Sequence, residues 1–283
     1  MNSNMTLSTI LRVKLPWADI ALKVVGSGQP VILLHGGGPG TSSLDWNTCM
    51  NHLADGIQCF APDLPGFGKS GKLKDGFNDG LGIYVDTIIA LMDLFCIDSC
   101  VLVGHSMGAA VAAALAVQYP DRIRHLIVVA PGGGFYGIDD YTSAGMAAIS
   151  EVIEQPTEAK IQSLVELLCH QTEIQPEQVR RRINLLTNSE LLEVQRKIHF
   201  NHSNRSDAEK LRRASFAPLI KVFKSRVTLI WGDRERFNPV ELGERILAKL
   251  PKHAIYALIK SAGHNVHCDK PAEVAKIISD AAL

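Results

Sequence analysis

A serine between two glycines is the first sign of chemistry in this sequence. Residues 104–108 read Gly-His-Ser-Met-Gly, so Ser106 follows a short apolar run and precedes an Ala-rich stretch. A strand-to-helix turn of this kind is tight, and Gly104 and Gly108 leave room for it. The serine hydroxyl then projects at a helix N-terminus, where developing negative charge is favoured. The pattern predicts that Ser106 is a nucleophile; a glycine-rich turn with a solvent-exposed serine is the alternative.

A serine hydroxyl is a weak nucleophile and needs a base beside it. Among the ten histidines, His264 lies in a loop between the last predicted strand and the last predicted helix. A histidine near the C-terminus fits the order serine, acid, histidine that is typical of hydrolases with a G-x-S-x-G turn. His267 is a nearby rival, but we expect it to begin the following helix. We therefore predict that His264 is the base.

The acid that orients the histidine is expected at the end of the preceding strand. Residues 231–236 there read Trp-Gly-Asp-Arg-Glu-Arg. Asp233 and Glu235 both qualify chemically, and one of them must be an ordinary charged residue of a turn. Arg234 and Arg236 flank the two carboxylates, so we expect these arginines to keep either one ionised. The residues alone leave the choice of acid open.

Acyl transfer also requires donors for the negatively charged oxygen of the intermediate. Residues 36–38 are consecutive glycines, and they let backbone N–H groups approach a substrate without obstruction by side chains. We predict that the N–H groups of Gly37 and Met107 form this oxyanion site and that Gly38 contacts the substrate. Glycine-rich loops also bind phosphates, but the run is not part of a GxxxxGK[ST] motif.

The same residues imply no cofactor, because serine, water and backbone dipoles suffice for the chemistry. His264, His267, Cys268 and Asp269 are of metal-binding types, but they crowd one short segment without a second half elsewhere, so we expect no metal. The formal charge is zero, with 29 Lys and Arg against 29 Asp and Glu. This balance argues against a nucleic-acid-binding protein. We expect a small-molecule substrate and no membrane partner, and a homo-oligomer is compatible with the sequence.

The composition is that of a globular protein, with 46% hydrophobic and 20% charged residues among 283. The six cysteines contain no CxxC pair and are expected to be reduced thiols. Arg12, Lys14 and Asp19 interrupt the apolar runs near the N-terminus, which argues against a secretory signal. No uncharged stretch approaches the roughly 18 residues of a membrane span. We expect a soluble, cytoplasmic protein.

Short apolar runs alternate with helix-like segments along the chain. Strands are predicted for residues 19–25, 31–34, 101–103, 126–129, 227–231 and 254–258, and for a run that ends at residues 59–63. Helices are predicted for residues 81–95, 106–119, 239–250 and 271–282. This alternation indicates a mostly parallel sheet with helices on both faces.

The character of the sequence changes after residue 134. Residues 136–204 show helical periodicity and no convincing strand. The stretch is too long and too apolar for a loop. We therefore predict an inserted helical lid, residues 135–204, between two parts of an α/β core, residues 1–134 and 205–283.

With these features the chain resembles the α/β-hydrolase superfamily over nearly its whole length. Within it, the chain is most similar to the meta-cleavage product hydrolases, which split carbon–carbon bonds in ring-opened aromatic catabolites. Residues 33–40, LLHGGGPG, resemble the oxyanion-loop motif of these enzymes, and residues 63–70, DLPGFGKS, resemble a segment shared by many superfamily members. The resemblance implies an α/β-hydrolase fold and a serine hydrolase.

Three further segments bear on the site. Residues 231–239, WGDRERFNP, stand where these enzymes typically carry WGRDDRFVP or WGREDRVNP, and a gap-free alignment puts the catalytic acid on Glu235, with Asp233 as the alternative. Residues 177–182, EQVRRR, resemble a lid segment whose final arginine, here Arg182, holds the keto-acid end of the substrate; a surface charge run is the alternative. Substrate-contacting asparagine and tryptophan of the family are replaced by His105 and Asn265.

These observations favour a hydrolase that cleaves an activated C–C bond beside a ketone. The alternative is a carboxylesterase, lactonase or thioesterase of a small hydrophobic acyl compound, because Gly-His-Ser-Met-Gly is common in such enzymes. A protein that binds a ligand on this fold with slow turnover or none is a third hypothesis, and the intact triad and oxyanion loop argue against it.

Overall fold

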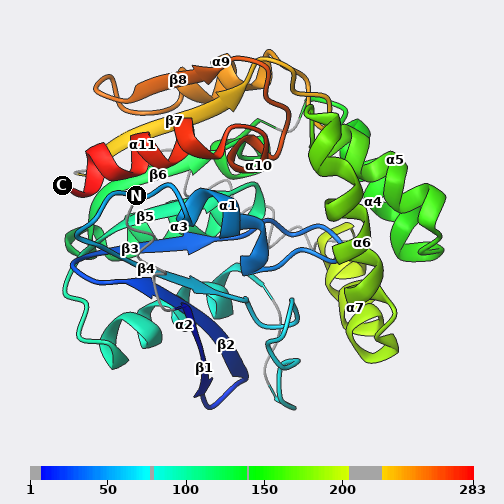
Figure 1. The fold of residues 1–283 in the computed structure, drawn as a ribbon, viewed down its shortest axis with the longest axis horizontal. Coiled ribbons are helices and arrows are strands. Elements are labelled where there is room, and N and C mark those ends of the chain that lie inside the picture. The colour runs from blue at the N-terminus through cyan, green and yellow to red at the C-terminus, as the bar shows by residue number, and fades with distance from the viewer. Residues whose placement is uncertain (1–7, 77–79, 139, 204–224) are drawn as a thin grey trace, which may run out of the picture.

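A mixed β-sheet forms the centre of the molecule (Figure 1). Its strands are β1 (Ser8–Lys14), β2 (Asp19–Gly26), β3 (Gln29–Leu34), β4 (Ile57–Pro62), β5 (Cys100–His105), β6 (Ile123–Val129), β7 (Arg226–Gly232) and β8 (Ile255–Ile259). In this computed structural model, which describes residues 8–76, 80–138, 140–203 and 225–283, their order is β1-β2-β4-β3-β5-β6-β7-β8. The β1–β2 and β2–β4 pairs are antiparallel, and the other neighbours are parallel. The prediction of a mostly parallel sheet is confirmed.

Helices cover both faces of this sheet, as predicted (Figure 1). One face packs against α2 (Leu81–Leu94), α3 (Met107–Gln118) and α9 (Leu242–Leu247). The other packs against α1 (Asn47–Met50), α10 (Val266–Asp269) and α11 (Pro271–Ala282). Strand β3 shows why its apolar run is continuous: Ile32 and Leu34 contact the first cluster, and Val31 and Leu33 contact the second. Strands buried on both faces carry such runs.

In the described part of the segment between β6 and β7, four helices form a separate layer beside the carboxyl ends of the strands (Figure 1). They are α4 (Ala144–Glu154), α5 (Glu158–Leu168), α6 (Gln175–Leu186) and α7 (Ser189–Ser203). Their buried apolar side chains form a third cluster, which includes Ile149, Leu164 and Val179. The inserted helical lid is thus part of the fold. Its exact limits at residues 135 and 204 stay a prediction, because residue 204 and those up to 224 lie outside the described residues.

Strand β1 and helix α9 are among the elements at which the structure differs from the sequence prediction. Strand β1 was not predicted, because Arg12 and Lys14 interrupt its apolar pattern; it lies at the sheet edge, where exposed charges are tolerated and only Val13 between them is buried. The helix predicted for residues 239–250 is shorter. Its first residues form turns in which the Leu242 N–H donates to the Pro239 carbonyl, three residues back, so the helix begins at Leu242.

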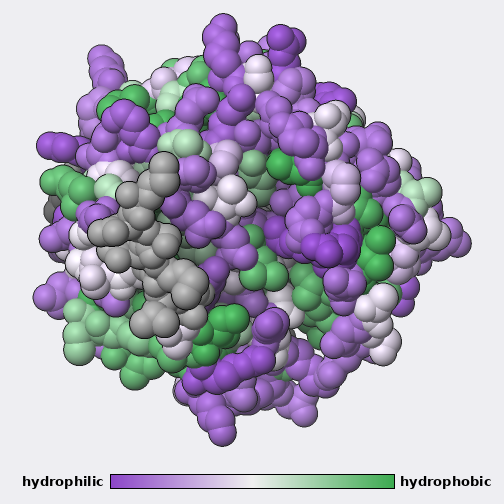
Figure 2. Space-filling view, in the orientation of Figure 1, coloured by the Kyte–Doolittle hydropathy of each residue, from purple (hydrophilic) through white to green (hydrophobic). Residues whose placement is uncertain are grey.

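Hydrophilic residues cover most of the face seen in Figure 2, and the apolar residues on it form small groups. Within the described ranges, no helix is long and apolar enough to cross a membrane. The six cysteines are free thiols, and five of them are buried. A cavity between the core and the lid, rather than the surface, points to the function.

Candidate active site

Ser106 lies between the end of β5 and the start of α3, in a backbone conformation that only a tight turn requires. Its φ is +52° and its ψ is −112°, and its N–H donates to the Val129 carbonyl at 2.9 Å. A Cβ added to Gly104 would lie 2.2 Å from the Gly108 carbonyl oxygen, and one added to Gly108 would lie 2.5 Å from the His35 carbonyl oxygen, so both positions need glycine. Strained residues of this kind cost about 1–3 kcal/mol and persist where the surrounding structure holds them. The predicted nucleophile thus stands on a strained strand-to-helix turn.

His264 and Glu235 form a buried pair in the loops after β8 and β7. Nδ1 of His264 donates to Oε2 of Glu235 at 2.8 Å, and the two side chains are 1% and 0% exposed. The other oxygen of Glu235 accepts the backbone N–H groups of Phe237 at 2.7 Å and Asn238 at 3.2 Å. Because Nδ1 carries the proton, Nε2 presents a lone pair; this buried atom has no partner among the described residues. His264 can therefore accept a proton at Nε2.

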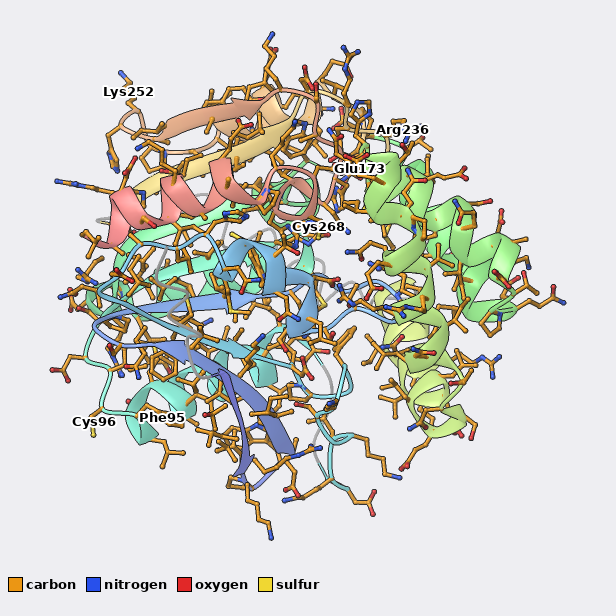
Figure 3. The ribbon with its side chains drawn as sticks, in the orientation of Figure 1. Phe95, Cys96, Glu173, Arg236, Lys252 and Cys268 are labelled. Atoms are coloured by element: carbon orange, nitrogen blue, oxygen red, sulfur yellow. The ribbon has the colours of Figure 1, made fainter. Side chains whose placement is uncertain are left out.

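The alternative acid, Asp233, faces away from the histidine. Its Oδ1 accepts the Ser261 N–H at 2.7 Å and lies 3.8 Å from Nε of Arg234. Among the described residues, neither Arg234 nor Arg236 makes the expected pair with Glu235. The polar partners of Glu235 are His264 and two backbone N–H groups. Arg236, labelled in Figure 3, instead donates to the Glu166 carbonyl of lid helix α5. Two backbone N–H groups thus contact the carboxylate of Glu235 where arginine side chains were expected.

Two aromatic rings hold the imidazole of His264 in place. The ring of Phe237 stacks on it, with centroids 4.2 Å apart and planes 17° from parallel. The His105 ring meets it edge-on at 4.9 Å, and Nε2 of His105 donates to the His264 carbonyl at 3.1 Å. Burial lowers the pKa of His105 well below its ordinary value, so this ring is neutral at pH 7. His105, predicted to contact substrate, therefore also supports the histidine loop.

The glycine loop after β3 lies against the serine turn. A Cβ added to Gly37 would come within 2.7 Å of Sδ of Met107, so the two predicted oxyanion residues are neighbours. The hydroxyl of Thr41 lies within hydrogen-bond distance of the Gly36 and Gly38 carbonyls, at 2.9 and 2.7 Å. These contacts give the Gly36 and Gly38 carbonyls hydrogen-bond partners within the loop, which suits a loop whose N–H groups bind an oxyanion.

The three adjacent arginines of α6 have three different environments. Arg180 is exposed and pairs with Glu177. Arg181 donates to Asp45 of the core at 2.9 Å. Arg182 is 1% exposed; its Nη1 donates to Oε1 of Gln178 at 2.7 Å, and its Nε and Nη2 have no partner in the described part of the chain. One arginine of the run therefore faces the cavity with free donors, and it is the predicted one.

Asp45 supplies the negative charge beneath these arginines. Burial raises the pKa of this carboxyl, but the guanidinium groups of Arg182 and Arg181 outweigh that effect and leave the pKa below its ordinary value. Asp45 is therefore ionised, and it joins lid helix α6 to the core through Arg181. Sequence reasoning missed this residue, although Ser42 and Asp45 form a capping box that marks a helix start.

The residues near His264 that were considered as metal ligands make other contacts. His267 stacks on Trp46 with centroids 4.1 Å apart. Cys268, labelled in Figure 3, belongs to α10, and its Sγ contacts the Asp45 carbonyl and the amide of Gln178 on lid helix α6. Asp269 accepts three backbone N–H groups, from Gly263, His170 and Gln171. Among the residues that the structure describes, no group of three or more His, Cys, Asp or Glu is placed to hold a metal ion.

One cavity of about 260 Å³ joins these parts at the border of core and lid. It brings together every predicted site residue except Glu235, which lies behind His264: Ser106, His264, Gly37, Met107, Gly38, His105, Arg182 and Asn265. Most of the remaining wall is apolar and comes from both layers, including Phe67, Leu81, Ile149, Ile153, Leu164, Leu168 and Ile198. Sequence reasoning missed several polar residues of this wall, among them Gln195 and Asn238.

The comparison with known families agrees with this geometry. A family model described as the alpha/beta hydrolase fold matches residues 30–271. The chain belongs to this family. As an α/β hydrolase it is a hydrolytic enzyme, and its substrate is a small molecule, as the sequence predicted.

Named relatives of this α/β hydrolase act on ring-opened aromatic compounds. It is 29% identical over 254 residues to a 2-hydroxy-6-oxo-6-phenylhexa-2,4-dienoate hydrolase of Burkholderia cepacia, covering 87% of this chain and 84% of that protein. It is also 29% identical over 254 residues, with the same coverage, to a 2-hydroxy-6-oxononadienedioate/2-hydroxy-6-oxononatrienedioate hydrolase of Comamonas testosteroni. The resemblance to meta-cleavage product hydrolases is thus confirmed.

A solved structure shows the same fold. It is a 2-hydroxy-6-oxo-6-phenylhexa-2,4-dienoate hydrolase from Rhodococcus sp. strain RHA1, with a TM-score of 0.83 at 23% identity. The match covers 97% of this chain and 99% of that one. The α/β-hydrolase fold predicted from the sequence is confirmed along nearly the whole chain.

Proposed function

We propose that this enzyme hydrolyses an activated C–C bond beside a ketone in a ring-opened 2-oxo acid, with Ser106 as nucleophile, His264 as base and Glu235 as the acid that orients it. The observation that carries the substrate class is Arg182. The guanidinium of Arg182 is buried with Asp45 as a nearby charge, but its Nε and Nη2 have no hydrogen-bond partner among the described residues, and buried donors are costly to leave unpaired unless an acceptor binds them. A carboxylate accepts both N–H groups side by side.

The lining of the cavity suits the two ends of such a substrate. Arg182 binds the carboxylate, and the serine turn with the glycine loop meets the ketone. The apolar wall, with Ile149, Leu164 and Leu168 from the lid, takes the substituent beyond the ketone. An alkyl or phenyl group there contributes about 25 cal/mol per Å² of apolar surface that it buries.

The reaction follows from these positions. The dienol form of the substrate first becomes the keto form by moving a proton to carbon, which makes the neighbouring C–C bond breakable. Ser106 then adds to the ketone while His264 takes its proton, and the N–H groups of Gly37 and Met107 stabilise the oxyanion. When the tetrahedral intermediate collapses, the C–C bond breaks, its electron pair passes into the oxo-acid fragment, and His264 returns a proton there. Water then hydrolyses the acyl-serine and frees a carboxylic acid.

The relatives support this substrate class. The named enzymes of Burkholderia cepacia and Comamonas testosteroni act on a 6-phenyl dienoate and on a dienedioate. Both compounds carry a 2-hydroxy acid end and a 6-oxo group. The departures at His105 and Asn265 leave Arg182 as the charged group that recognises the acid end in the described cavity wall.

The test is to measure kcat/KM for 2-hydroxy-6-oxo-6-phenylhexa-2,4-dienoate and for p-nitrophenyl acetate on one preparation. We expect dienoate cleavage to be the faster reaction by more than tenfold. Ser106→Ala should lose activity on both, since loss of the serine costs on the order of 10⁶ in kcat in a comparable triad. No cleavage of the dienoate by an enzyme that hydrolyses the ester would overturn the proposal and leave the carboxylesterase alternative. A Ser106→Ala variant with a tenth of the wild-type rate would exclude a serine mechanism.

A further inference from the structure

Gln195 is a buried polar residue of the cavity that neither the triad nor Arg182 explains. It lies on α7, its side chain is 3% exposed, and it lines the catalytic cavity. Its Oε1 accepts the backbone N–H of Gly40 at 3.1 Å. Its Nε2 is buried without a hydrogen-bond partner among the described residues. The oxygen is thus engaged, and the free group is a donor.

The contact with Gly40 fixes which end of the amide is free. If the amide turned over, its NH₂ group would face the N–H of Gly40, two donors would oppose each other, and a hydrogen bond would be lost. The oxygen therefore stays on Gly40, and Nε2 remains the unpaired atom. Leaving a buried donor unpaired is expensive, so a site of this kind is built for an acceptor.

Gly40 also places Gln195 next to Arg182. A Cβ added to Gly40 would lie 2.9 Å from both Cα and Cγ of Arg182, so helix α6 packs against Gly40. Gln195 of helix α7 binds the N–H of the same glycine. Both side chains line the same cavity, and both keep N–H groups without a hydrogen-bond partner among the described residues. These donors are Nε and Nη2 of Arg182 and Nε2 of Gln195, and both residues lie against Gly40 at one end of the glycine loop.

We propose that Gln195 is a specificity-determining residue that donates from Nε2 to the oxo-acid end of the substrate. This inference rests on the proposed function for the identity of the substrate. A 2-oxo or 2-hydroxy acid carries three oxygens on adjacent carbons, which matches the three donors. The carboxylate pairs with the two N–H groups of Arg182, and the neighbouring 2-oxygen accepts from Gln195. Simple esters have no such group and gain nothing from this donor.

Two variants isolate the donor. Gln195→Glu keeps an oxygen for the Gly40 N–H but replaces the donor with a carboxylate, whereas Gln195→Met removes both polar ends without adding charge. We expect both variants to lower kcat/KM for the dienoate by about 10- to 100-fold, mainly through KM, because the buried 2-oxygen of the substrate loses its donor and is left unpaired. The loss for p-nitrophenyl acetate should be at least tenfold smaller. Glu193→Gln, an exposed exchange on the same helix beside Lys197, is the control and should change neither rate by more than twofold.

Inhibition of ester hydrolysis tests the donor without any C–C cleavage. In the wild type, 2-oxohexanoate should inhibit more strongly than 2-hexanone, and Gln195→Met should raise the inhibition constant of the oxo acid alone by at least tenfold. If the dienoate is not cleaved but this pattern holds, the proposed reaction fails and the role of Gln195 stands. If the dienoate is cleaved and neither Gln195 variant shifts the inhibition constant, the inference is wrong. Equal losses on dienoate and ester, with a lowered Tm, would show a purely structural role.

Discussion

Oε2 of Glu235 lies 2.8 Å from Nδ1 of His264, whereas Asp233, two residues earlier, binds the N–H of Ser261. The position after the strand decides between the two carboxylates. Asp233 still belongs to the strand end, where the Asp233 N–H donates to the Ile259 carbonyl of the neighbouring strand. Glu235 has left the sheet, and its longer side chain reaches the histidine loop while backbone N–H groups hold its second oxygen.

The first prediction is that Glu235→Gln lowers kcat by on the order of 10² or more. The acid fixes the tautomer of the base and stabilises the imidazolium, and its loss in a protease triad costs roughly 10⁴. Asp233→Asn should leave kcat within about tenfold and change mainly the thermal stability. Steady-state kinetics and Tm of both variants make the comparison. A reversed pair of phenotypes would mean that Asp233 is the acid.

The second prediction concerns the arginine run of α6. Arg182→Met keeps an apolar side chain of similar length but removes the guanidinium, so kcat/KM for the dienoate should fall by at least about 100-fold, the value of a hydrogen-bonded charge pair. The same variant should lose less than tenfold on p-nitrophenyl acetate, which has no carboxylate. Arg180→Met is the control, because Arg180 is exposed and pairs only with Glu177 among the described residues. Equal losses on both substrates would remove Arg182 from substrate binding.

The sequence predicted the parts of the site that depend on local pattern. Gly104 and Gly108 around Ser106 are required by close backbone contacts at the turn, so their spacing predicts both the strand-to-helix turn and the nucleophile. The mostly parallel character of the sheet likewise follows from buried apolar runs such as that of β3. The nature of the acid needed a family alignment in addition, because both candidates lie within three residues of the same strand end.

The remaining parts of the site depend on how elements that are distant in the sequence pack together, which a local pattern does not reveal. Asp45 meets Arg181 across 136 residues, and Gln195 meets Gly40 across 155. No spacing in the chain marks such pairs, since they arise only when α6 and α7 lie on the glycine loop. The same holds for Phe237, whose ring packs so closely against α4 that an added Cβ at Gly145 would lie 1.9 Å from it.

The third prediction uses the buried ring of His267. Burial lowers the pKa of His267 to about 4, against about 6.5 in an unfolded chain. Between these two values the unfolded state binds a proton that the folded state excludes, so the free energy of unfolding falls as pH decreases from about 6.5 to about 4. At about 1.4 kcal/mol per pH unit, this group alone accounts for a loss of about 3 kcal/mol.

A substitution can isolate the contribution of His267 to the pH dependence of stability. Asp45 faces the ring and favours its charged form, while His264, Arg181 and Arg182 oppose it, and burial is the largest influence. Neither ring nitrogen has a partner among the residues described, so His267→Phe keeps the stack on Trp46 without losing a hydrogen bond. Urea unfolding at pH 7 and pH 4.5 should show a smaller loss of stability in the variant. An unchanged pH dependence would mean that another group dominates.

The last prediction concerns Asp269, which ties the lid to the histidine loop. One oxygen of its carboxylate accepts the N–H groups of Gly263 at 2.7 Å and His170 at 2.9 Å, and the other accepts the Gln171 N–H at 2.9 Å. In parallel, the Asn265 N–H donates to the Leu168 carbonyl at the end of α5. The loop that carries His264 is therefore held from the lid on both sides of the histidine.

Asp269→Asn replaces one acceptor oxygen with a donor that faces backbone N–H groups. We expect a loss of about 2 kcal/mol in the free energy of unfolding, the usual value of a hydrogen bond to a charged group, and a fall in kcat of at least tenfold, because the imidazole is no longer fixed. Asp280→Asn on α11 is the matched control; its exposed pair with Lys276 contributes less than about 1 kcal/mol. Urea unfolding and ester kinetics report the two effects. A variant that loses stability while keeping the wild-type kcat would show that Asp269 holds the lid without positioning His264.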